Sequence, residues 1–196
     1  MFVFSRKKQH TKSTQQGFSL IELMVTITLV TLITGLLMAK YSSFNDVVLL
    51  KNQAYEIALD IREAQIFGVS ARGENGTFKE AYGIYIEKDS PNYFLFQDTN
   101  NNLKYDPGEE IGQAYTIDSR FEIFQICDDN NCNRSKTSVA FKRPDFDAYI
   151  RLANGSGNLS NSDEGYIEIK MRSKNSNGFS KKIVVYQSGQ ISVQTN

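Results

Sequence analysis

The feature that most constrains this chain is the apolar run 18–39, whose only charged residue is Glu22. At about 1.5 Å per residue, a helix of this length reaches about 33 Å, enough to cross a hydrocarbon core of about 30 Å. A basic leader precedes the run, since residues 1–17 contain three lysines, one arginine and no acid. The run exceeds the apolar region of about 7–15 residues in a secretory signal, and no small-residue cleavage site follows it. It therefore predicts a membrane-spanning helix whose basic leader lies on the cytoplasmic side.

Glu22 does not fit a simple membrane anchor. A carboxylate in an apolar span costs about 2.5–3.5 kcal/mol at the helix centre on insertion scales, less near an end, and usually marks a partner or a function. The residues leading to it read Gly17-Phe18-Ser19-Leu20-Ile21-Glu22. This segment, placed between a basic leader and an unbroken apolar run, resembles the signal of type IV pilins and pseudopilins. The alternative is a glutamate at the membrane surface, solvated by lipid headgroups.

The resemblance implies a processing site and an assembly signal. Prepilin peptidase would cut between Gly17 and Phe18, the new amine of Phe18 would be N-methylated, and Glu22 would neutralise the amine of a neighbouring subunit. Two charges that are costly to hold apart in lipid become tolerable as a pair. The implied location is the bacterial inner membrane, crossed once, with the C-terminal head in the periplasm and later in a pilus or pseudopilus. The implied partners are the peptidase, other pilins or pseudopilins, and the assembly platform.

The helix is expected to continue beyond the membrane. No proline occurs before Pro91, and no glycine lies between Gly35 and Gly68. From residue 47 onward, apolar residues recur at spacings of three and four, which is the pattern of an amphipathic helix. They are Val47, Leu50, Ala54, Ile57, Ala58, Ile61 and Ala64. We expect one helix of roughly 50 residues that ends between Gly68 and Gly73 and packs its second half on an apolar surface.

The remainder of the chain is predicted to be a β-rich head. Short runs rich in Ile, Val, Tyr and Phe are separated by clusters of Asn, Asp, Gly, Ser or Pro. These runs are 82–87, 93–97, 114–117, 121–126, 137–141, 148–152, 166–171, 182–186 and 191–194. The expected fold is α+β, with a long N-terminal helix packed on a small antiparallel sheet or sandwich, as in the type IV pilin fold. The expected divisions are a cleaved leader (1–17), a transmembrane half-helix (18–39), an amphipathic half-helix (40–70) and the head (71–196).

The order of features in the head resembles that of the pseudopilin H and FimT/FimU minor-pilin group. The matching stretches are FLFQDTNNNLKYDPGEEI, VAFKRPDFDAYI and KKIVVYQSGQISV. The resemblance implies a structural subunit, a minor pilin or pseudopilin, of a type IV pilus or a type II secretion pseudopilus, which assembles through its N-terminal helix.

The alternative is a minor pilin that binds DNA for uptake in natural transformation. DNA-binding members of the group carry Gly-Arg-x-Arg at the closing hairpin, whereas this chain has Gly189-Gln190-Ile191-Ser192. Loss of two arginines removes phosphate contacts. Cations near aromatic residues keep the alternative open. These are Lys170, Arg172, Lys174, Lys181 and Lys182. They are equally typical of solvated charges that protect a strand edge.

An acidic loop raises the question of calcium. Six residues occupy positions 1, 3, 5, 7, 9 and 12 of an EF-hand-like register. They are Asp98, Asn100, Asn102, Lys104, Asp106 and Glu109. Against calcium, Leu103 stands at position six where that register requires glycine, and no paired helices flank the loop. A solvated turn rich in Asp and Asn explains the same residues. Calcium is the one cofactor that the sequence suggests, and both interpretations stay open.

Cys127 and Cys132 are the two cysteines, separated by a short polar segment that would let them approach within bridging distance. We expect a disulfide, maintained by an oxidising periplasm, rather than two free thiols. Two thiols without a nearby histidine make half of a zinc site. The one histidine, His10, lies in the leader, and no P-loop, nucleophile elbow or metalloprotease motif occurs. The chain is therefore not expected to be an enzyme.

Overall fold

The computed structural model describes residues 17–70, 80–155, 157–161, 165–174 and 176–195. The expected leader lies outside the described residues, except for Gly17. Contacts divide the chain into two compact units, Met1–Ser42 and Ser43–Asn196. Helix α1 spans Leu20–Val69, a length of 50 residues. This confirms the prediction of one long helix, which the absence of proline and the scarcity of glycine allow.

The first unit contains an apolar span, Leu20–Met38, that is long and apolar enough to cross a membrane, with a mean hydropathy of 2.2. Its apolar side chains are exposed throughout. Four threonine hydroxyls in this span donate to backbone carbonyls three or four residues earlier, at 2.7–2.9 Å. Such bonds satisfy the hydroxyls without water. Glu22 is left as the charged group of the span.

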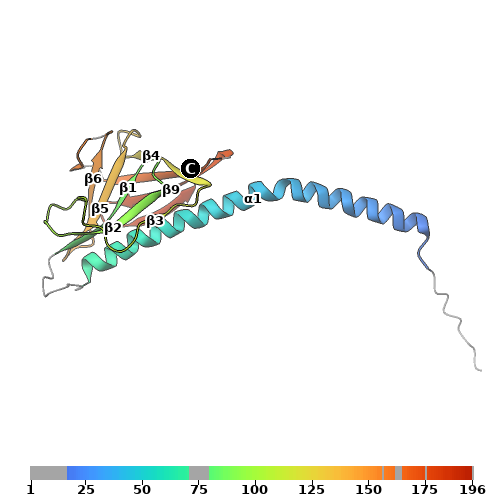
Figure 1. Ribbon diagram of the computed structural model, residues 1–196, viewed down its shortest axis with the longest axis horizontal. Coiled ribbons are helices and arrows are strands. Elements are labelled where there is room, and N and C mark those ends of the chain that lie inside the picture. The colour runs from blue at the N-terminus through green and yellow to red at the C-terminus, as the bar shows by residue number, and fades with distance from the viewer. Residues whose placement is uncertain (1–16, 71–79, 156, 162–164, 175, 196) are drawn as a thin grey trace, which may run out of the picture. The chain divides into compact units, whose positions relative to one another are not determined.

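Ten strands lie in the described part of the head, in two antiparallel sheets (Figure 1). One sheet has the order β3-β2-β1-β5-β6-β7 and the other the order β10-β9-β8-β4. The strands are β1 (Ala81–Glu87), β2 (Asn92–Asp98), β3 (Tyr115–Thr116), β4 (Phe121–Cys127), β5 (Lys136–Phe141), β6 (Ala148–Ala153), β7 (Ser160–Asn161), β8 (Tyr166–Ser173), β9 (Ser176–Tyr186) and β10 (Ile191–Thr195). All nine predicted strands are present. The sequence reasoning missed β7, because its two exposed polar residues carry no apolar alternation.

The second half of α1 and both sheets share one apolar core. The buried helix residues are Leu50, Ala54, Ile57, Ala58, Ile61 and Ala64. They contact inward-facing side chains such as Ile84 of β1 and Ile169 of β8. Burying a side chain of the size of Ile or Leu contributes about 1.5–3 kcal/mol. The amphipathic prediction is thus confirmed, and the α+β architecture is consistent with the pilin fold.

Polar contacts fix the helix on the head, and two of them involve Asp60 and Gln65. The Tyr93 hydroxyl donates to the carboxylate of Asp60, and burial raises the pKa of Tyr93 far above its usual value, so the phenol keeps its proton. The Gln65 side chain donates to the carbonyls of Phe146, at 3.2 Å, and Gly189, at 2.9 Å. Gln65 is 2% exposed. The sequence reasoning missed it, although a glutamine beside Ala64 on the apolar face is an available signal.

Candidate processing and assembly site

The Gly17–Phe18 peptide bond lies immediately before α1. Phe18 is 82% exposed. A Cβ placed on Gly17 would have no heavy atom within 4 Å, apart from the two neighbouring residues in the chain. The first hydrogen bond of the helix runs from the Leu23 N–H to the Ser19 carbonyl, at 3.1 Å. Ser19 is therefore the N-cap residue. An exposed, non-helical bond near a terminus is the kind of substrate a peptidase can accept.

Glu22 lies in the first turn of α1, where a carboxylate is stabilised by the positive end of the helix dipole. Ser19 and Glu22 have the spacing of a capping box, a sequence signal for a helix start that the sequence reasoning did not use. Cleavage after Gly17 would create an ammonium group at Phe18, four residues before this carboxylate. Glu22 is therefore placed near the start of the apolar span, where its carboxylate can pair with an ammonium group.

A long helix with an apolar first half, an exposed Gly17–Phe18 bond at its start and an antiparallel β head are together consistent with the fold of pilin-like proteins. A sequence model of the prokaryotic N-terminal methylation motif matches residues 12–38. This match covers Gly17, Phe18 and Glu22 and supports a type IV pilin-like protein that a prepilin peptidase processes and that assembles with other pilins. Searches of curated proteins and of solved structures returned no significant match.

The acidic loop is organised around two buried carboxylates. The wholly buried Asp98 accepts from the backbone N–H groups of Asn102, at 3.1 Å, and Leu103, at 2.9 Å. Glu109 accepts from Thr99 and from the backbone of Asp106, each at 3.0 Å. Leu103 has a φ of 60°, so position six takes the left-handed conformation without glycine. The missing glycine, which counted against calcium in the sequence, is no obstacle to the loop geometry.

Hydrogen bonds also close the other half of this loop. The side-chain nitrogens of Asn100 and Asn102 donate to Asp106, and the Lys104 ammonium lies 3.4 Å from it. The bond from Asn100 is the main cause that lowers the pKa of Asp106. Among the described residues, no group of three or more His, Cys, Asp or Glu side chains is placed to hold a metal ion. The geometry is that of a hydrogen-bonded turn, and calcium binding is the alternative that a titration decides.

A calcium titration separates these two interpretations. Because the carboxylates of Asp98 and Glu109 already have backbone partners, we expect calcium to leave the midpoint of thermal unfolding of the detergent-purified chain unchanged. The control is the Asp98→Asn variant measured with calcium and with a chelator. A midpoint that rises with calcium in the native chain, and not in Asp98→Asn, would establish the calcium site.

The expected disulfide is present, between Cys127 and Cys132. The loop it closes is organised by Asp128, which is 5% exposed. Its carboxylate accepts from the backbone N–H groups of Asn130, at 3.1 Å, and Asn131, at 2.6 Å, and forms an ion pair with Arg134. The residues between the cysteines therefore form a hydrogen-bonded loop around Asp128, while Asp129, Asn130 and Asn131 are themselves exposed.

The cations proposed for DNA binding are mostly paired with acids. Glu168 lies 3.4 Å from the Lys170 ammonium and 2.5 Å from that of Lys182, and Arg172 lies 2.8 Å from Glu122. Lys181 donates to Thr195 at 2.6 Å, whereas Lys174 is exposed. The structure thus brings Lys170, Arg172 and Lys182 to the outward face of β8 and β9, as members of a mixed-sign network. Because acids neutralise part of their charge, these five cations provide less positive potential for binding phosphates than their number in the sequence suggested.

Proposed function

We propose that this chain is a structural subunit, a minor pilin or pseudopilin of a type IV pilus or a type II secretion pseudopilus, and not an enzyme. The observation that carries the proposal is the exposed Gly17–Phe18 bond directly ahead of an apolar span, Leu20–Met38, whose single charge is Glu22. The match to the N-terminal methylation motif over residues 12–38 supports it.

The proposed sequence of events combines what the resemblance to pilins implies with the chemistry of these residues. The basic leader holds the N-terminus at the cytoplasmic face, which leaves the head in the periplasm. Prepilin peptidase removes residues 1–17, and the new amine at Phe18 is methylated and stays charged. The carboxylate of Glu22 then pairs with the Phe18 amine of a neighbouring subunit. This pairing removes the cost of holding either charge alone in lipid, and so it favours assembly on the platform.

Deletion of the gene in its host tests the proposal and distinguishes the two machines. We expect loss of surface pili or loss of exoprotein secretion, restored by the native gene on a plasmid. Piliation, secretion and transformation are scored in parallel in the same strains. Loss of transformation alone, with pili and secretion intact, would replace the proposal with the DNA-uptake alternative. Unchanged values in all three assays would contradict the structural role.

A further inference from the structure

In the described part of the head, the two sheets have four edge strands, and three of these edges are protected against further pairing. Strands β3 and β7 have two residues each, and a very short strand is one of the ways in which proteins protect an edge. Strand β4 is longer, but other segments of the chain cover it. The carbonyls of Ile123 and Ile126 accept from the backbone N–H groups of Asp89, at 3.0 Å, and Arg134, at 3.2 Å. The fourth edge is β10.

Strand β10 has none of these protections. It is five residues long, contains no proline and no charged residue, and pairs with β9 without a shift of register. The Tyr186 N–H donates to the Gln190 carbonyl at 2.9 Å, so these two residues form a hydrogen-bonded pair. Such pairs recur at every second residue of an antiparallel ladder. Ser192 therefore also bonds β9, whereas Ile191 and Val193 direct their N–H and C=O groups away from β9, toward the free edge.

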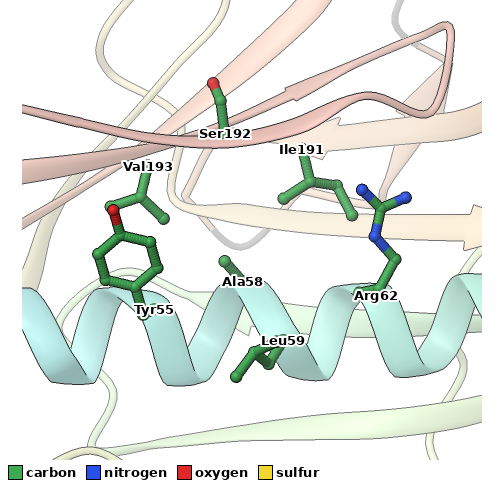
Figure 2. A pocket seen from close by; sticks show the side chains of 7 residues that line it. All are labelled: Tyr55, Ala58, Leu59, Arg62, Ile191, Ser192 and Val193. Atoms are coloured by element: carbon green, nitrogen blue, oxygen red, sulfur yellow. The ribbon is translucent and has the colours of Figure 1, made fainter.

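A groove of about 170 Å³ lies beside this edge, between β10 and α1. Figure 2 shows Ile191 and Val193 pointing from β10 toward the helix, and Ser192 pointing away from it. On the helix side, the groove is lined by Tyr55 and Leu59, which are 46% and 67% exposed. A strand added at this edge would turn every second side chain toward the helix, because side chains alternate along a strand. Apolar side chains at those positions would cover Tyr55 and Leu59.

Arg62 gives the groove a charge. It lines the groove together with Ile191, and Figure 2 shows the two side chains next to each other. One guanidinium nitrogen donates to the side-chain oxygen of Gln65. Within the described residues, Arg62 forms no ion pair with a carboxylate. A guanidinium has five N–H donors and binds carboxylates in a bidentate manner, so an acidic side chain is the group that complements this end of the groove.

Strands from a second copy of this chain do not meet these requirements. The β10 edge of another copy carries no carboxylate and would leave Arg62 without an acid. The β3, β4 and β7 edges of another copy are protected in the ways described above. The complementary segment therefore belongs to a different protein.

We propose that β10 binds an extended segment of a different protein as an additional, antiparallel strand. An antiparallel orientation continues the pattern of this sheet and is slightly more stable than a parallel one. The segment places an apolar residue opposite Val193, over Tyr55 and Leu59. Two positions later it places an acidic residue opposite Ile191, next to Arg62. In this mode of recognition, main-chain hydrogen bonds provide affinity and alternate side chains provide specificity.

Binding of a synthetic peptide to the full chain, purified in detergent, tests the proposal. The probe is a fluorescein-labelled heptapeptide, Thr-Val-Thr-Val-Thr-Asp-Thr, and fluorescence anisotropy reports binding. We expect saturable binding that weakens about tenfold when the central valine is N-methylated, because its N–H would donate to the Val193 carbonyl. The control is N-methylation of the following threonine, whose N–H points away from β10 and which should bind as the unmodified peptide does. The proposal is overturned if the probe does not bind saturably, or if both methylated peptides bind equally well.

A proline in β10 tests the edge from the side of the protein. Val193→Pro removes the N–H that faces the added strand and leaves the bonds of Ser192 to β9 in place, as is tolerated on edge strands. We expect binding of the probe to weaken about tenfold. The midpoint of thermal unfolding shows that the variant is folded. Undiminished binding to folded Val193→Pro would exclude strand addition at β10.

A charge exchange tests the acidic residue. Arg62→Glu should bind the aspartate probe about fivefold more weakly than the native chain does, and should prefer a probe with lysine in place of aspartate. A gain for the lysine probe cannot come from damage to the fold. Equal affinity of the native chain for the aspartate and lysine probes would overturn the inferred acidic residue.

The inference goes beyond the proposed function and is tested separately, because neither the Gly17–Phe18 bond nor Glu22 takes part in peptide binding. Specific binding by a chain whose gene is needed for neither piliation nor secretion would contradict the proposed function and retain the site at β10. Loss of pili or secretion on gene deletion, without peptide binding, would contradict the site at β10 alone.

Discussion

We expect Glu22→Val to leave cleavage after Gly17 intact and to reduce entry of the subunit into fibres more than a hundredfold. Valine fits an apolar span, so the variant should insert in the membrane as the native chain does. In the variant, the charged Phe18 amine of the neighbouring subunit has no carboxylate to pair with, and assembly is therefore destabilised. Leaving one charge of a desolvated pair alone costs about 3–5 kcal/mol, which corresponds to a factor of more than a hundred.

Two measurements and one control separate assembly from processing. The mass of the membrane-bound chain reports removal of the leader, and the amount of the subunit in sheared fibres reports assembly. Thr26→Val is the matched control, since the Thr26 hydroxyl already donates its proton to the Leu23 carbonyl of its own helix, at 2.9 Å. Glu22→Val fibres at the native level would show that the carboxylate has no assembly role.

The second large effect is expected at Gly189. This residue has a φ of 78°, and a Cβ built there would lie 2.0 Å from the Phe146 carbonyl oxygen and 2.6 Å from the Gln65 side-chain nitrogen. Gly189→Ala therefore has two costs. Alanine is strained in the left-handed backbone conformation, and its Cβ pushes the β9–β10 hairpin away from α1. We expect a loss of about 2–5 kcal/mol in the free energy of unfolding, measured by denaturant titration of the purified chain in detergent.

Gly112→Ala provides a matched control for the backbone term. Gly112 has a φ of 72°, but a Cβ there would meet no atom within 4 Å. It should lose about 1–2 kcal/mol, the cost of the left-handed conformation alone. Equal losses at the two positions would contradict a packing role for Gly189. A larger loss at Gly189 would mean that packing requires this glycine of the Gly-Gln-Ile-Ser turn, whether or not the hairpin contacts DNA.

Local pattern was sufficient for most of the fold. The 3.6-residue period of Leu50, Ala54, Ile57 and Ile61 predicted the face of α1 that is buried, and alternation of β-branched and aromatic residues predicted nine strands. Both signals are local, because side chains return to the same face at a fixed spacing along a helix or a strand. The pairing of β4 with β8, which separates β4 from its sequence neighbours β3 and β5, has no such local signal.

The candidate site divides in the same way. Gly17, Phe18 and Glu22 were predicted from sequence, because a peptidase signal and a charge in an apolar span are local patterns, and they lie within the match to the N-terminal methylation motif. The tertiary structure decided the rest. Tyr55 and Leu59 are large hydrophobic residues of the same helix, yet they are exposed because the head covers the other side of α1. Gln65 and Gly189, 124 residues apart, met because burial left the carbonyl of Gly189 in need of a donor.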